Sequence, residues 1–243
     1  MEAVDLGNVK RHRLHDQVVK HLAVRILEGV DARSEPVTTT EAELCRDLNV
    51  SRTILRQAVK VLEAKGLVDV RPRVGVRIRP RREWNVADPD LLAWQSEMQP
   101  DAHFLKSLCE VRRILEPAAA ELAALRADNV QIAEIHAWYR EMERYVEDPE
   151  PFIAADMEFH KAIFSAARNE LLARISSTIG TALRTSRTIT TRRPGSSIQA
   201  LEWHRAVADA IRDHDAPGAR AAMDWLIQQT TRDIEDVMRA QGT

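Results

Sequence analysis

The stretch TEAELCRDLNVSRTILRQAVKVLEAKGLVDVRPRVGVRI, residues 40–78, decides the fold of the N-terminal third. Thr40 with Glu43 three residues later is a capping box, which predicts that a short helix begins there. Asn49 suits a tight turn after this helix, because asparagine tolerates the left-handed conformation. Ser51 then caps a second helix, whose apolar residues recur with a helical period. Two short helices joined by a tight turn are therefore expected.

The pattern becomes alternating after Gly66. Valine and isoleucine alternate with charged residues over 68–78, which predicts a β-hairpin. Residues 10–28, which precede the two short helices, carry an apolar residue at every fourth position and predict an amphipathic helix. Helix, short helix, turn, helix and basic hairpin is the order of a winged helix-turn-helix.

The rest of the chain predicts helices. Residues 81–101 read as a connector with two tryptophans, and helices follow near 102–126, 129–147, 151–168, 170–191, 198–213 and 216–239. Pro117 should kink the first of them. The predicted fold is mainly α. It has a winged helix-turn-helix over residues 8–80 and, after the connector, an all-helical bundle over 102–240.

The charge distribution is uneven along the 243 residues. Up to Arg82 there are 17 Lys and Arg against 11 Asp and Glu, a net of +6, and the remainder has 18 against 26, a net of −8. A basic first third suggests nucleic acid as a partner. Without a membrane-length apolar run or an export signal, we expect a cytoplasmic protein with two reduced cysteines, Cys45 and Cys109.

The start of the second short helix is where a helix-turn-helix meets the major groove. We predict DNA contacts from this helix and from the hairpin, made by Ser51, Arg52, Thr53, Arg56, Arg71, Arg73 and Arg77. Arg52 and Arg56 lie one turn apart, and an arginine can bind guanine through two hydrogen bonds. The alternative is that they are solvated charges on an amphipathic helix.

Residues 40–78 resemble the DNA-binding domain of the GntR family of transcription factors. The helical part resembles the FCD effector domain of its FadR-type branch, in EVRRILEPAAAELAA (110–124), DMEFHKAIF (156–164) and WHRAVADAI (203–211). EAELC at 41–45 and the W-N-x-x-D-x-D-x-L-x-W motif at 84–94 are similar to the branch that contains galactonate-operon repressors. Ala42 departs from the family, where many members have a DNA-contacting arginine.

The stretch 156–164 places Asp156 and His160 on one helix face, because they are four residues apart. By the resemblance, these two residues and His204 match three metal positions of FCD domains, suited to Zn²⁺, Ni²⁺ or Mn²⁺. Leu226 stands where relatives carry a fourth, histidine ligand. Two hypotheses stay open, a three-ligand metal site or direct hydrogen bonds from these side chains to an effector.

Arg112 matches a position where the family often places a pocket arginine, and a guanidinium can bind a carboxylate through two hydrogen bonds. The alternative is a surface arginine paired with Glu116. Arg184, Arg187 and Thr191 are further polar candidates near the pocket.

The resemblance implies a ligand-responsive regulator rather than an enzyme. We expect a homodimer on a palindromic operator, most simply a repressor released by a sugar acid such as galactonate. Another small carboxylate, such as lactate or glycolate, is the alternative effector. A metal-dependent hydrolase with Glu158 or Glu202 as base, and a constitutive nucleoid-type DNA binder, are the rival functions.

Overall fold

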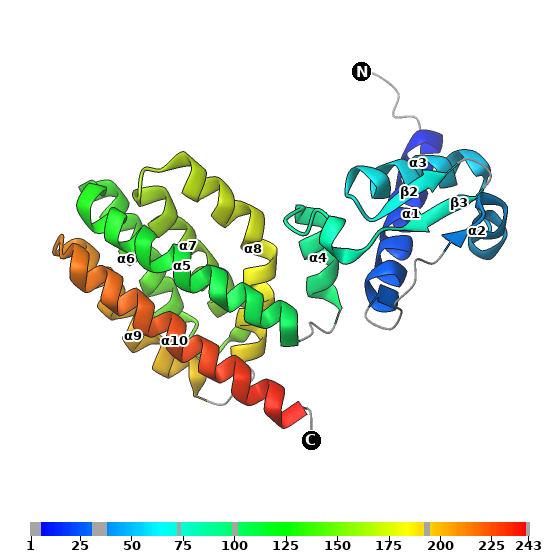
Figure 1. Ribbon diagram of the computed structural model, residues 1–243. Coiled ribbons are helices and arrows are strands. Elements are labelled where there is room, and N and C mark those ends of the chain that lie inside the picture. Colours follow the sequence, from blue (N-terminus) through cyan, green and yellow to red (C-terminus); the bar gives the residue numbers. More distant parts are fainter. Residues whose placement is uncertain (1–5, 31–37, 72–73, 99–101, 192–194, 242–243) are drawn as a thin grey trace, which may run out of the picture. The chain divides into compact units, whose positions relative to one another are not determined.

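The computed structural model describes residues 6–30, 38–71, 74–98, 102–191 and 195–241. The chain divides into two compact units, Met1–Met98 and Gln99–Thr243 (Figure 1). Each unit has its own hydrophobic core.

Unit 1 is a winged helix-turn-helix, as predicted. Its elements are α1 (Leu6–Val30), β1 (Thr38–Thr39), α2 (Glu41–Leu48), α3 (Arg52–Ala64), β2 (Val68–Arg71), β3 (Gly75–Ile78), η1 (Arg81–Glu83) and α4 (Pro89–Glu97). The antiparallel sheet has the order β1-β3-β2, with Val70 opposite Val76 and Thr38 opposite Arg77. Strand β1 was not foreseen, because two threonines carry no alternating pattern.

The turn between α2 and α3 forms through the local signals in the sequence. The Thr40 hydroxyl accepts a hydrogen bond from the Glu43 amide at 3.2 Å, and the Glu43 carboxylate accepts one from the Thr40 amide at 2.9 Å. Asn49 has the left-handed conformation, with φ of 51°. The Ser51 hydroxyl accepts from the Ile54 amide at 3.4 Å and caps α3. These caps fix where each helix begins and so how α3 is presented.

The segment expected as a connector contains α4, which packs in unit 1. Trp84 and Trp94 are buried in its core. The ammonium group of Lys65, at the end of α3, lies 2.8 Å from an Asp88 oxygen and 2.6 Å from an Asp90 oxygen. Lys65 is only 9% exposed, so these two ion pairs lie largely away from water. They hold the start of α4 against the end of α3.

Unit 2 is entirely helical in the residues that the structure describes. Its elements are α5 (Ala102–Arg126), α6 (Asn129–Arg144), α7 (Pro149–Ala166), α8 (Glu170–Thr190), α9 (Ser196–Arg212) and α10 (Ala216–Gln241). Helix α10 packs along α5 and α9, and α6 packs along α7. Four alanines after Pro117 in α5 are buried, which allows close helix packing: Ala119, Ala120, Ala123 and Ala124. The bundle is as predicted.

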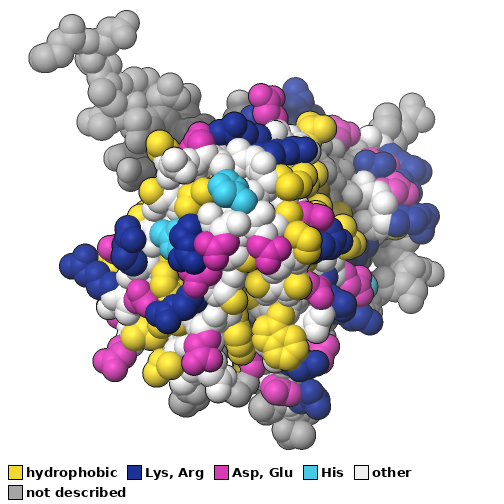
Figure 2. Space-filling view, turned by 90° about the vertical axis from the view of Figure 1, so that its left-hand side faces the viewer, with side chains coloured by type: hydrophobic (Ala, Val, Ile, Leu, Met, Phe, Trp, Pro, Cys, Tyr) yellow, Lys and Arg dark blue, Asp and Glu magenta, His cyan; other side chains and the backbone are white. Residues whose placement is uncertain are grey.

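The surface of unit 2 differs from its interior in the way charges are distributed. Figure 2 shows one face on which acidic and basic side chains alternate with hydrophobic ones. Acids and bases beneath the surface are concentrated instead around one buried cluster. None of the described helices combines the length and apolar character needed to cross a membrane.

The close approach of Gly66 to the backbone of Glu83 can be tested by substitution. The φ of Gly66 is +76°, and an added Cβ would lie 2.8 Å from the carbonyl oxygen of Glu83. We expect Gly66→Ala to lower the free energy of unfolding by about 2 kcal/mol or more, because strain and a backbone clash add. Urea unfolding followed by circular dichroism would measure it. Gly29→Ala, with nothing within 4 Å of the new Cβ, should be neutral or stabilising, and equal losses would contradict this account.

Candidate functional site

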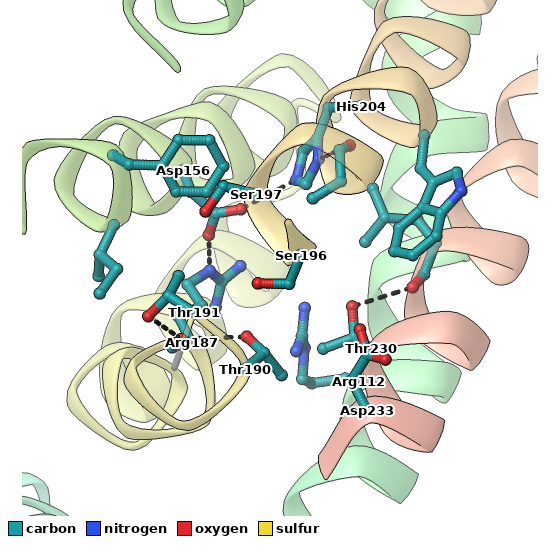
Figure 3. A pocket seen from close by; sticks show the side chains of 15 residues that line it. Arg112, Asp156, Arg187, Thr190, Thr191, Ser196, Ser197, His204, Thr230 and Asp233 are labelled. Carbon is teal, nitrogen blue, oxygen red and sulfur yellow. Dashed lines mark hydrogen bonds and ion pairs between the residues drawn. The ribbon is translucent and has the colours of Figure 1, made fainter. Parts of the chain in front are cut away.

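A cavity within unit 2 collects polar side chains from five helices (Figure 3). The main contributors are Arg112 of α5, Asp156 of α7, Arg187 of α8, Ser196 and His204 of α9, and Asp233 of α10. The space open to the centres of water-sized molecules is about 40 Å³, enough for roughly three waters.

The structure brings Asp156, His160 and His204 together, as the sequence suggested. Their potential ligand atoms all lie within 4.8 Å of one another. Oδ1 of Asp156 lies 2.9 Å from Nε2 of His204 and 3.8 Å from Nε2 of His160. The two Nε2 atoms are 3.2 Å apart. All three side chains are buried.

The outer atoms of the two histidines determine what the inner atoms can do. Nδ1 of His204 lies 2.7 Å from the carbonyl oxygen of Ala200, which only accepts hydrogen bonds, so Nδ1 carries the hydrogen. Burial and the nearby charge of His160 lower the pKa of His204 well below its ordinary value, so its ring is neutral near pH 7. Its Nε2 then presents a lone pair towards the Asp156 carboxylate.

His160 is held in a similar way by an acid. Its Nδ1 lies 2.7 Å from Oε2 of Glu116, in a bent contact rather than a straight hydrogen bond. Burial alone would raise the pKa of Glu116, but the charges of Arg112 and His160 outweigh it and lower that pKa. The Glu116 carboxylate therefore stays ionised and faces Nδ1, leaving Nε2 turned towards Asp156 and His204.

Oδ1 of Asp156 and the two Nε2 atoms converge on one point, where all three could serve as ligand atoms for a cation. Without a proton or a metal ion, the lone pairs of Oδ1 and the two Nε2 atoms repel one another. One carboxylate and two imidazoles suit a divalent transition metal, with the remaining coordination positions open. Leu226, the residue at the fourth family position, lines the cavity and offers no ligand atom.

Arg112 combines the two roles that the sequence left as alternatives. Its Nε donates to Oε1 of Glu116 at 2.7 Å, which is the predicted pairing with the residue four positions later. The pair lies inside the bundle rather than on the surface, because Arg112 is 2% exposed and Glu116 1% exposed. Arg112 also lines the cavity. Glu116 was considered only as a surface partner, and no sequence pattern indicated its contact with His160.

Of the further candidates, Arg187 and Arg184 of α8 differ in burial. Arg187 is buried, lines the cavity and contacts Oδ2 of Asp156 through Nε. Burial and the charge of Arg112 lower the pKa of Arg187 to about 9, so it remains charged at neutral pH. Arg184 is half-exposed and pairs with Glu150 at 2.5 Å. Thr191 lines the cavity.

The predicted DNA-contacting residues that the structure describes lie at the start of α3 and in the β2–β3 hairpin, the wing. Ser51, Arg52, Thr53 and Arg56 are exposed, and Arg56 pairs with Glu41 at 3.0 Å. In the wing, Arg77 binds Asp69 through two hydrogen bonds of 2.8 Å, which lower the pKa of Asp69 to about 2. Nε and Nη2 of Arg77 are therefore already paired with Asp69. Arg71 is exposed, and its Nε donates one hydrogen bond to Asp69 at 3.2 Å. Arg73 lies outside the described residues.

Comparison with known proteins agrees with both units. Residues 14–78 match the model "Bacterial regulatory proteins, gntR family", and residues 107–229 match the FCD domain model. The chain belongs to the GntR family. The resemblance stated from the sequence is confirmed, including its FCD effector domain.

Among its relatives is the galactonate operon transcriptional repressor of Escherichia coli K12, 32% identical over 91% of this chain and 97% of that protein. A putative L-lactate dehydrogenase operon regulatory protein of the same strain is 30% identical over 87% of this chain and 82% of that protein. The solved structure named Streptococcus agalactiae GntR is 27% identical, covers 88% of this chain and 99% of its own, and has a TM-score of 0.51. This GntR-family chain is a transcriptional regulator, and the hydrolase hypothesis is wrong.

The burial of neutral His204 predicts a pH dependence of stability. Because its pKa is lower folded than unfolded, the unfolded chain binds more protons below about pH 6.5, and stability falls as pH falls. Metal-free protein should lose up to about 1.4 kcal/mol per pH unit from this group between pH 6.5 and 5. The measurement is urea unfolding at each pH in the presence of chelator.

His204→Gln should flatten this slope, because glutamine does not titrate. His103→Gln, which changes an exposed histidine of α5, should leave the slope as in the wild type. Equal slopes in all three proteins would show that His204 does not cause the effect.

Proposed function

We propose that this GntR-family regulator is a repressor of a sugar-acid catabolic operon and that an aldonate such as galactonate releases it from its operator. The observation that carries the proposal is the buried cavity, in which the Arg112 guanidinium lies with Asp156 and His204. A guanidinium suits a carboxylate, and a carboxylate with imidazoles suits hydroxyl oxygens, directly or through a metal. An acid with neighbouring hydroxyls carries both kinds of group.

The identity of the acid is supported by relatives. The chain aligns with the galactonate operon repressor over nearly its whole length. A regulator named for an L-lactate dehydrogenase operon is similar to a comparable degree, which makes lactate the competing effector. A Uxu operon transcriptional regulator of E. coli K12 is 32% identical over 54% of this chain. Sugar acids and lactate share a hydroxyl beside the carboxylate, but an aldonate carries further hydroxyls, and these would distinguish it from lactate.

Asp156, His160 and His204 would hold a divalent ion such as Zn²⁺, Ni²⁺ or Mn²⁺. This metal site is supported by the convergence of three potential ligand atoms. The contacts of Glu116 with Nδ1 of His160 and of the Ala200 carbonyl with Nδ1 of His204 orient the two rings. When bound, the metal would supply positions for the oxygens of a hydroxy acid. In the metal-free alternative, the same three side chains bind the hydroxyls directly.

The DNA-binding form would be a homodimer, because two recognition helices related by a two-fold axis match a palindromic operator. The effector weakens DNA binding only if it binds the DNA-incompetent state more tightly. A 100-fold loss of operator affinity corresponds to about 2.7 kcal/mol of coupling, well within the range of a few charged contacts. This response distinguishes the regulator from a constitutive nucleoid-type binder.

The function is tested by operator retardation with a panel of acids. D-galactonate should release the DNA fragment that carries the operator, whereas lactate at the same concentration should not. His160→Ala should keep operator affinity within about twofold and abolish the release, since His160 is buried in unit 2, whereas α3 belongs to unit 1. Release by lactate alone would overturn the sugar-acid assignment, and loss of DNA binding in His160→Ala would make the residue structural.

DNA reading by α3 has a separate test. Arg52→Ala should weaken operator binding by about 1–3 kcal/mol, because one arginine–guanine pair is worth that much. Arg140→Ala, which removes an exposed arginine of α6, should leave affinity unchanged. Fluorescence anisotropy with labelled operator at fixed salt would measure both, and equal affinities would contradict the role of Arg52.

A further inference from the structure

A second set of polar groups lines the cavity beside the three potential metal ligands. Nη2 of Arg187 and Oγ of Ser196 are buried, and among the described residues neither atom has a hydrogen-bond partner. Both residues are only 5% exposed. Figure 3 shows the Ser196 hydroxyl between the guanidinium groups of Arg187 and Arg112, at the cavity. Buried polar atoms are nearly always paired, so two unpaired donors that share one cavity point to a ligand.

The first turn of α9 adds donors at the same place. The helix begins at Ser196, and the preceding Gly195, with φ of 78°, provides no side-chain cap. The first N–H groups of a helix lack partners within it, and the end they mark carries partial positive charge. Ser196 and Ser197 both line the cavity. The uncapped end of this 17-residue helix therefore faces the same space as the unpaired side chains.

The two cavity arginines each contact an acid through Nε, Arg112 with Glu116 and Arg187 with Asp156. Arg112 binds Glu116 through Nε at 2.7 Å, and its Nη1 makes only a long contact of 3.5 Å to the Ser186 hydroxyl. Arg187 contacts Asp156 through Nε, while Nη1 makes a long contact of 3.4 Å to the Leu183 carbonyl. Nη2 of Arg187 is thus left without a hydrogen-bond partner among the described residues. An anion bound there would reduce the repulsion between the two cations.

We propose that Arg187, Ser196 and the first turn of α9 form a carboxylate-binding site that works without a metal ion. One carboxylate oxygen accepts from Nη2 of Arg187, and the other accepts from the Ser196 hydroxyl and a free N–H of α9. The inference rests on the proposed function and sharpens it, because the protein rather than the metal then holds the acid group of the effector. The rest of the effector extends towards Asp156, which the same guanidinium contacts.

The test uses the full chain, stripped of metal with EDTA and free of DNA, with acetate as the probe. Acetamide, which has nearly the same shape and no charge, is the matched probe. Acetate should raise the melting temperature of the wild type in proportion to its occupancy, and acetamide should not. Isothermal titration calorimetry gives the dissociation constant. Because no operator is present, failure here leaves the operator-release assay unaffected.

Variants assign the binding to the proposed residues. Arg187→Gln should weaken acetate binding by about tenfold or more, and Ser196→Ala by roughly threefold, since one donor to a charged group is lost. Arg184→Gln changes the exposed arginine one turn earlier on α8 and should bind acetate like the wild type. If Arg187→Gln fails to fold by circular dichroism, Arg187→Lys keeps the charge but loses the fork and should still weaken binding.

Three results would overturn the inference. The first is acetate binding that appears only after Zn²⁺ is restored, because the metal would then hold the carboxylate. The second is equal stabilisation by acetate and acetamide, which would exclude recognition of charge. The third is wild-type affinity for acetate in both Ser196→Ala and a folded Arg187 variant, which would place the anion elsewhere.

Discussion

The burial of the Asp156 carboxylate beside two imidazoles and the Arg187 guanidinium is the constraint on which unit 2 depends. A charged group removed from water costs several kcal/mol unless it is paired, and Asp156 is 6% exposed. Its two oxygens are used differently. Oδ1 faces His160 and His204, whereas Oδ2 faces Arg187. The two histidines are then held by further groups, so one buried carboxylate organises side chains of four helices, α5, α7, α8 and α9.

This organisation explains why the outer residues matter as much as the three potential ligands. The Ala200 carbonyl fixes the hydrogen on His204, and Glu116 directs the ring of His160. Glu116 is itself neutralised by Arg112, which also lines the cavity. An anion that displaces or tightens one guanidinium therefore changes the environment of the carboxylate beside it. In the proposed function, effector binding would therefore change the geometry of the Asp156 cluster through direct contacts.

The sequence predicted unit 1 well because its signals are local. The Thr40–Glu43 capping box, Asn49 and Ser51 each specify the backbone within a few residues, and the structure has each of them in that role. Helix α4 was not predicted, because the Asp-Pro and tryptophan residues of its segment are also typical of a linker. Its place in unit 1 depends on the ion pairs of Lys65 with Asp88 and Asp90. Tertiary pairing over more than 20 residues leaves no periodic pattern.

The pocket was predictable only in part for the same reason. Asp156 and His160 follow from a four-residue spacing, and His204 from family resemblance. Arg187 and Ser196 come to line one cavity only when α8 packs against α7 and α9 packs against α5, α6 and α10. Arg187 and Arg184 look alike in sequence, yet one is 5% exposed and the other pairs with Glu150 at the surface.

The residues of α3 proposed to contact DNA are exposed, whereas the charged residues of the cavity are buried. Arg52 and Arg56 lie in water, where salt screens their attraction to phosphate, so operator affinity should depend steeply on ionic strength. Arg112, Arg187 and Asp156 are buried, where screening is weak and each lost partner is costly. Substitutions in α3 should thus alter DNA affinity alone, while substitutions at the cavity should alter the response to the effector. A regulator can in this way change its operator and its effector independently, because different physical terms govern each.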